Sequence, residues 1–328
     1  MSWYNTSKTT LAMSKNSEHS SSAYCIFQQP WWLEAVAPGQ WKIIEVKQGD
    51  KVTAALPYII QKQFGLTLLI MPPLTQMLGP WIADIPGKYA TRLSREKELM
   101  NSLIGQLPPF DYFKQNFHYS IDNWLPFYWK GFEQTTRYTY VLEDLTDTDR
   151  LWNNFTGSTR REIRKAEKQV TVTKEHEPEL IWGLHRRTLN RKNASTREDF
   201  ELFSRIFEAS TSRNQGQLFM ARDAGENIHA ALFLVWDRHS AYYLMGGAAD
   251  RFRTSGAQSL LMWEAIKFAS DKTNTFDFEG SMLEPVERFF RGFGARQRPY
   301  FQITKMSRKA GLLIHSRNLV QSLLGSNR

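Results

Sequence analysis

The stretch from residue 241 to residue 305 constrains the fold more than any other part of this chain, because its pattern orders strand, loop, helix and strand. Apolar residues 241–245 predict a strand that ends in two glycines, and residues 257–270 predict a long, mostly apolar helix. The first N–H groups of a helix have no internal partner, so the polar loop 248–256 can hold an anion in front of this helix. A helix with an arginine pair and two short strands complete the stretch, the strands at 276–278 and 300–305.

Length and composition indicate a globular protein of about two domains. The chain has 328 residues, of which 41% are hydrophobic, enough to bury sizeable cores. Its net charge of +9 points to anionic partners such as phosphates, nucleotides, tRNA or an acidic membrane face, whereas a basic protein without such a partner is the alternative. The one cysteine, Cys25, excludes an intrachain disulfide and fits a reducing cytosol. We expect no metal site, since His229 and His239 have no carboxylate at ligand spacing.

The two ends of the chain differ in composition from the middle. Residues 1–22 are rich in Ser, Thr, Lys and Asn and have no apolar core, so they predict a disordered leader rather than a signal peptide. Residues 306–328 form a basic amphipathic tail whose leucines fall at helical spacing. We expect this tail to pack on the protein; a helix lying on a membrane surface is the alternative. The expected location is cytoplasmic, with membrane association through the tail as the variant.

The middle of the chain divides into two halves of similar pattern. Each half gives the order helix, hairpin, helix, strand, so we predict domains at 23–150 and 151–305. Between the halves, residues 151–168 predict a helix broken at Gly157, and its second part is strongly basic. Cations four residues apart share a helix face, so this part suits phosphate contacts. A solvated face laced with Glu162 and Glu167 is the alternative.

Several segments together resemble a known family. They lie at 138–140, 158–166, 256–266, 276–281 and 289–294. With these segments the chain resembles the FemAB-type branch of the GNAT acyltransferase superfamily, close to the BioF2-like acetyltransferase domain, over about residues 24–305. The resemblance implies an α/β (α+β) fold of two tandem GNAT-like domains, with mixed, largely antiparallel central sheets flanked by helices.

The resemblance also implies an activity. Members of the family transfer an amino acid from aminoacyl-tRNA to a peptidoglycan precursor, or are presumed to transfer acyl groups in envelope polysaccharide or lipid pathways. We therefore expect an acyltransferase that acts on a cell-envelope precursor, with acyl-CoA or aminoacyl-tRNA as co-substrate and no tightly bound cofactor. Gln258 stands where members that bind acyl-CoA have a small residue, and residues 192–219 lack the helical arm of some members that use tRNA, so both donors stay open.

Candidate site residues follow from the chemistry of acyl transfer. This reaction needs groups that stabilise a tetrahedral oxyanion, and a general base accelerates it. Asp277 and Glu279 alternate along the predicted strand, so they share a face, and Glu279 is the preferred base. Ion pairs of both carboxylates with the arginine pair are the alternative. Residues expected to bind the donor or its phosphates are Arg253, Gly256, Ala257, Arg288 and Arg291. Residues expected to bind the acceptor or precursor are Arg160, Arg161, Arg164, Lys165 and Tyr243.

Three classes of function thus remain open from the sequence. The first is the acyl or aminoacyl transferase. The second is a non-catalytic binding protein with a degenerate GNAT-like site, and the third is an RNA-binding module that uses the basic helix at 160–168. We expect small-molecule or envelope-precursor substrates, tRNA as a further partner, and no DNA.

Overall fold

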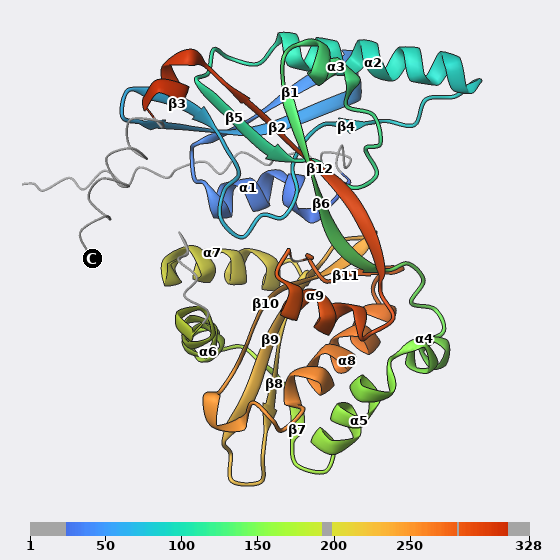
Figure 1. The fold of residues 1–328 in the computed structure, drawn as a ribbon, viewed down its shortest axis with the longest axis vertical. Helices are drawn as coiled ribbons and strands as arrows, with labels where there is room; N and C mark the ends of the chain where they lie inside the picture. The colour runs from blue at the N-terminus through green and yellow to red at the C-terminus, as the bar shows by residue number, and fades with distance from the viewer. Residues whose placement is uncertain (1–23, 192–198, 281, 314–328) are drawn as a thin grey trace, which may run out of the picture.

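The computed structural model describes residues 24–191, 199–280 and 282–313 (Figure 1). Within these residues a 12-stranded mixed sheet runs through the molecule, and helices cover both of its faces. The two long strands β6 (Glu133–Leu142) and β12 (Arg296–Met306) run from one half of the molecule into the other. The halves therefore share a continuous sheet, and a site can form where the strands of one half meet those of the other.

The N-terminal half begins with a helix turn and a helix that starts at Pro30, whose fixed φ suits the first turn. A long hairpin follows, and its two-residue turn contains Gly49 in the left-handed region. The elements of this half are η1 (Ile26–Gln28), α1 (Pro30–Val36), β1 (Trp41–Gln48), β2 (Lys51–Gln63), β3 (Leu66–Leu69), β4 (Trp81–Ile82), α2 (Tyr89–Gly105), β5 (Tyr112–Asn116), α3 (Leu125–Trp129) and β6.

The C-terminal half begins with two short helices, each with a side-chain cap. Asp147 caps the first and Thr156 caps the second, so the predicted break at Gly157 is confirmed. The elements of this half are α4 (Thr148–Asn154), α5 (Gly157–Ala166), β7 (Thr171–Glu175), α6 (Pro178–Arg191), α7 (Phe200–Thr211), β8 (Gly216–Arg222), β9 (Ile228–Trp236), β10 (Ser240–Ala248), η2 (Asp250–Phe252), α8 (Ala257–Ser270), β11 (Thr275–Asp277), α9 (Glu284–Arg291) and β12.

The sheet has the order β1-β2-β3-β5-β12-β6-β11-β10-β9-β8-β7, with β4 paired to β2. Most neighbours are antiparallel; the pairs β3–β5 and β10–β11 are parallel. The predicted class, a mixed and largely antiparallel α/β fold, is confirmed. The last strand, β12, returns to lie between β5 and β6 of the N-terminal half, a position that its place at the end of the chain does not suggest.

The predicted division into two domains stays a prediction. The sheet continues across the predicted boundary. The boundary between residues 150 and 151 falls inside α4, and β12, from the second predicted part, pairs with β5 and β6 of the first. The predicted leader, 1–22, lies outside the described residues, and so does the tail beyond residue 313. None of the helices in the described part has the length and apolarity needed to cross a bilayer.

Three apolar clusters hold the layers together. One joins α4, α5, α8 and α9 to one face of the C-terminal strands, and the second joins α6 and α7 to the other face. Helix α1 of the N-terminal half packs in the second cluster against α7, so this cluster crosses between the halves (Figure 1). Its Trp32 is fully buried, and its indole N–H donates to Thr75 at 3.1 Å. Burial of such a side chain contributes about 3 kcal/mol, which helps to fix the relative position of the halves.

Candidate functional site

The strands β10 and β11 part in the middle of the sheet. They pair in parallel at three positions, ending at Tyr242 and Asp277, whereas β10 continues to Ala248. Beyond Tyr242 no described strand pairs with this edge of β10. Backbone groups along it have no ladder partner on this side, and at its far end Nδ1 of His185 lies 3.2 Å from the carbonyl oxygen of Gly246. We call this point the fork.

A bulge and two glycines shape β10 beside the fork. The register with β9 shifts between Tyr243 and Met245, which leaves Leu244 as the extra residue and bends the strand. The sequence predicted that this strand ends at Gly246 and Gly247, whereas β10 includes both glycines and ends at Ala248. A Cβ atom at Gly247 would lie 2.6 Å from the backbone of Leu184 in α6, so only glycine lets this helix pack so closely.

Glu279 lies at the fork, but not on the strand. Strand β11 ends at Asp277, and Glu279 has a φ of +59°, so the predicted alternation of the two carboxylates on one strand face is wrong. The carbonyl of Glu279 accepts a 2.6 Å hydrogen bond from the side chain of Gln76. Gly280 gives no open access to a substrate, since a Cβ atom there would lie 2.6 Å from Cα of Thr139. The positive φ values and this contact fix the turn against β6.

Asp277 is fully buried, and its carboxylate holds the same turn. Its Oδ1 atom accepts from the hydroxyl of Thr139 at 2.5 Å and from the backbone N–H of Glu279 at 2.8 Å, while Oδ2 has no hydrogen-bond partner among the described residues. Burial raises the pKa of Asp277 to about 6, against the lowering effect of these two bonds. Asp277 therefore positions Glu279 rather than sharing its place at the fork.

The N-terminal half contributes polar groups to the same region. Gln76 also approaches the hydroxyl of Tyr300 at 3.5 Å, and Tyr300 lies opposite Arg137 in the β12–β6 register. Burial raises the pKa of Tyr300, and the charge of Glu279 raises it further, whereas Arg137 lowers it through its charge and a hydrogen bond. None of these three residues is indicated by the sequence, since no local pattern shows that β12 lies beside β6 or that the loop carrying Gln76 lies beside Glu279.

Tyr243 and Gln258 approach the fork from the other side. Gln258, in the first turn of α8, donates to the hydroxyl of Tyr243 at 3.3 Å. Burial raises the pKa of Tyr243 well above its ordinary value, and the negative charge of Glu279 adds to this. Tyr243 thus stays protonated, and since its oxygen already accepts from Gln258, its own proton is available to another acceptor. We call Gln76, Arg137, Tyr243, Gln258, Glu279 and Tyr300 the fork site.

The start of α8 is covered, contrary to the expected phosphate cradle. Gly256 and Ala257 are buried, and a Cβ atom at Gly256 would lie 3.0 Å from the carbonyl carbon of Glu162 in α5. The N–H of Ala257 donates to the Ser255 hydroxyl at 3.3 Å. Arg253 is exposed on the loop. At Gly256 the loop before α8 therefore packs against the backbone of α5.

The basic helix α5 lies against this loop, and most of its cations contact the protein. Lys165 donates to the carbonyl of Thr254, and the guanidinium of Arg164 lies 5.6 Å from the ring centre of Trp152. Arg160 donates to the carbonyls of Trp152 and Asn153 at the end of α4. Arg161 is exposed. The helix and the Arg253 loop are thus neighbours, but these contacts do not involve the fork site.

The arginine pair of α9 does not bind the two candidate carboxylates in the way the alternative required. Arg291 pairs with Glu287 at 2.8 Å, and Glu287 also accepts from Tyr140. Arg288 is exposed on the same helix. Both arginines therefore lie on the outer surface of α9, and a role in donor binding remains a prediction.

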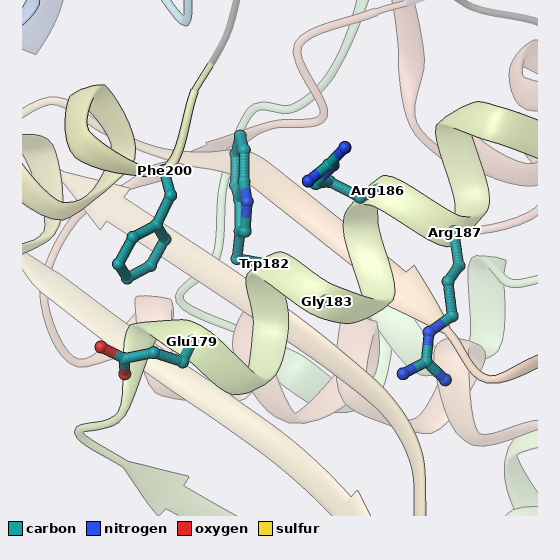
Figure 2. A pocket seen from close by; sticks show the side chains of 6 residues that line it. All are labelled: Glu179, Trp182, Gly183, Arg186, Arg187 and Phe200. Atoms are coloured by element: carbon teal, nitrogen blue, oxygen red, sulfur yellow. The ribbon is translucent and has the colours of Figure 1, made fainter.

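Two surface pockets are lined by residues other than those of the fork site. One has a volume of about 430 Å³ and lies between α6 and the start of α7, where Trp182 stands between Phe200 and Arg186 and Arg187 points the other way (Figure 2). The other lies between α1 and α7 beside Trp31. Among the described residues, no group of three or more His, Cys, Asp and Glu side chains is arranged to hold a metal ion.

Comparisons with known proteins agree with this fold. Residues 153–291 match the family model described as an acetyltransferase (GNAT) domain. The crystal structure of FemX superposes with a TM-score of 0.63 and 15% identity, covering 84% of this chain and 91% of FemX. The C-terminal domain of a putative lysylphosphatidylglycerol synthetase from Agrobacterium fabrum gives 0.52 at 14% identity, with 86% and 89% covered. The structure titled L-PGS from Bacillus licheniformis gives 0.52 at 11%, with 85% and 89% covered. No curated protein sequence matches significantly.

Residues 153–291 match a GNAT acetyltransferase domain, which supports a transferase. The described chain has the fold of FemX, which is consistent with a FemAB-like acyltransferase. The resemblance seen in the sequence is thereby confirmed. The fork lies within the matched residues, since β10 and β11 both belong to them.

Proposed function

We propose that this protein transfers an acyl or aminoacyl group directly to an amine or hydroxyl of a cell-envelope precursor, with the fork as its active site. The observation that carries the proposal is the parting of β10 from β11 with Tyr243 and Glu279 beside it. The free edge of a bulged strand offers backbone N–H groups to a carbonyl oxygen, and stabilisation of an oxyanion is the main requirement of acyl transfer.

The residues of the fork site have complementary roles in this reaction. The nucleophile of the acceptor attacks the acyl carbonyl carbon, and its proton passes to the carboxylate of Glu279. The bond from that carbon to the donor oxygen or sulfur then breaks, and the hydroxyl of Tyr243 can donate its proton to the leaving atom. Gln258 holds the Tyr243 oxygen at 3.3 Å, while Asp277 and Gln76 hold the backbone of Glu279. No covalent enzyme intermediate is needed.

The covered start of α8 favours aminoacyl-tRNA over acyl-CoA as donor. The loop expected to hold the diphosphate of acyl-CoA packs at Gly256 against the α5 backbone at Glu162. A tRNA has phosphates along its length and does not depend on that cradle. The names of two neighbours, lysylphosphatidylglycerol synthetase and FemX, also fit aminoacyl transfer to an envelope component. Acyl-CoA is the second donor to test.

Donor choice can be decided by binding and transfer together. Titration of the protein with aminoacyl-tRNA at several salt concentrations should show a steep loss of affinity with salt if phosphates are contacted. Transfer of a labelled amino acid or acetyl group to an envelope-lipid fraction then identifies the productive donor. Binding of RNA without transfer from either donor would instead support the RNA-binding module, and binding of precursor alone would support a non-catalytic protein.

The role of Glu279 is tested by Glu279→Gln, which keeps size and hydrogen bonding but removes the charge. We expect a loss of roughly 100-fold in turnover with little change in donor affinity, because a general base typically contributes this much. The melting temperature should stay near that of the wild type. A matched control is Glu284→Gln, an exposed glutamate at the start of α9. Unchanged turnover in Glu279→Gln, with the fold intact, would remove Glu279 from the mechanism.

A further inference from the structure

Arg137 is a half-buried arginine whose charge has no carboxylate partner among the described residues. Of the other half-buried arginines, Arg222 pairs with Glu175, and Arg160 donates to two backbone carbonyls. Arg137 instead lies opposite Tyr300 on β12 and bonds to its hydroxyl. A guanidinium taken partly out of water without an anion costs free energy, so its retention in this place needs another reason.

The position of Arg137 relates it to the fork. On β6, Arg137 and Thr139 are two residues apart and share a face of the strand. Thr139 bonds to Asp277, and Tyr300 shares Gln76 with the backbone of Glu279. Only Tyr300 thus separates Arg137 from Gln76, which donates to the carbonyl of Glu279. Tyr243 and Gln258 approach Glu279 from the α8 side, so the two sides of the fork carry different chemistry.

We propose that Arg137, with Tyr300 and Gln76, binds an anionic group of the acceptor and so orients its nucleophile toward Glu279. The inference rests on the proposed acyl transfer and adds a property of the substrate: a carboxylate or phosphate lies close to the amine or hydroxyl that is acylated. A guanidinium presents paired donors that match either anion, and the Tyr300 hydroxyl and the Gln76 amide add neutral donors beside it. An uncharged acceptor would leave Arg137 unpaired.

Binding of simple anions tests this site without turnover. The probes are N-acetylglycine for a carboxylate and glycerol 3-phosphate for a phosphate, titrated at low ionic strength into the full chain by NMR or calorimetry. Arg137→Gln should weaken binding of the preferred probe about 10- to 100-fold, since a hydrogen bond to a charged group contributes on that scale. Arg137→Lys should recover part of the affinity, because it keeps the charge but not the paired geometry.

Arg296→Gln is the matched control, since it removes the same charge from an exposed arginine on β12. It should change probe affinity less than twofold. Equal weakening in both variants, or no binding of either probe by the wild type, would overturn the anion site. The probe that binds more tightly identifies the anion as carboxylate or phosphate.

Turnover then separates this inference from the proposed function. With an accepted substrate, Arg137→Gln should raise KM for the acceptor and leave KM for the donor unchanged. If the wild type binds the probes through Arg137 but transfers nothing from either donor, the anion site stands and acyl transfer falls. If transfer proceeds and Arg137→Gln alters neither probe binding nor acceptor KM, the anion site alone falls.

Discussion

The fork site and the basic helix α5 both carry charged residues that suit an acyltransferase, yet their surroundings differ. At the fork, the carboxylate of Asp277 is fully buried and the guanidinium of Arg137 has no carboxylate partner among the described residues. On α5, Lys165 and Arg164 are exposed and contact a carbonyl and an aromatic ring of the protein. The first region holds polar groups where burial makes them costly, and the second holds them where water already solvates them.

This difference supports the fork, rather than α5, as the proposed active site. Buried polar groups and left-handed backbone are unfavourable, so they persist where the surroundings require them, and such places are often functional. Exposed cations with local partners occur on most protein surfaces and contribute little. We therefore expect substitutions at the fork to have large effects and substitutions on α5 to have small ones.

The largest effect is expected for Gly280→Ala. The φ of Gly280 is +57°, and the new Cβ atom would lie 2.6 Å from Thr139 Cα in β6. A left-handed residue with a side chain and a backbone overlap together should cost about 4 kcal/mol in the free energy of unfolding. Chemical denaturation followed by circular dichroism measures this.

Gly39→Ala is the control for that measurement. Gly39 also has a positive φ, +66°, but no atom lies within 4 Å of the position of its new Cβ. It should lose only about 1 kcal/mol, the cost of the backbone conformation alone. Equal losses in the two variants would mean that the contact between the Glu279 turn and β6 contributes nothing.

The next effect is a pH dependence that originates at Asp277. Its pKa rises from 3.8 in the unfolded chain to about 6 in the folded one, so the folded state binds the proton more tightly. The stability that this gives is present below about pH 4 and is lost as pH rises through 6. Asp277→Asn keeps the acceptor oxygen and removes the titration. The free energy of unfolding of the variant should rise relative to that of the wild type between pH 4 and pH 7, by about 3 kcal/mol at pH 7.

Asp144→Asn provides a control of opposite sign. Asp144 is exposed, and hydrogen bonds from Thr146 and Arg150 lower its pKa to about 2. Its contribution to stability is present above about pH 4 and is lost as pH falls toward 2. The two variants should therefore diverge from the wild type in different pH ranges. A flat difference for Asp277→Asn between pH 4 and 7 would show that the Asp277 carboxylate does not titrate there.

The sequence predicted elements well and their pairing poorly. Hydrophobic periodicity is local, so the helix Pro30–Val36, the hairpin after it and the break at Gly157 were all found. The pairing of β12 with β6 joins residues more than a hundred positions apart, and periodicity carries no information on such partners. Arg137 and Tyr300, which lie opposite each other on these strands, were missed for this reason.

The errors at the candidate site have a similar cause. The alternation of a strand was extended one step past Asp277, although the Glu-Gly-Ser sequence that follows favours a turn. The sequence predicts that the loop ending at Gly256 binds the donor or its phosphates, whereas the structure packs Gly256 against the backbone of α5, a neighbour that no spacing rule indicates. In both cases the residue type indicated a special backbone position, but the sequence did not reveal which segment contacts it.

The smallest effect on stability is expected for the double substitution Arg164→Glu with Lys165→Glu on α5. The bond from Lys165 to Thr254 and the contact of Arg164 with Trp152 are exposed, so their loss should cost less than about 1 kcal/mol. If α5 guides a tRNA donor, affinity should fall about 10-fold at low salt and converge with the wild type at high salt, while turnover at saturating donor stays unchanged. The matched control is Lys51→Glu with Lys62→Glu, the same change of charge on exposed positions of β2. Donor affinity that falls equally in both double variants would reflect net charge alone, and affinity unchanged in the α5 variant would leave this helix as a solvated surface.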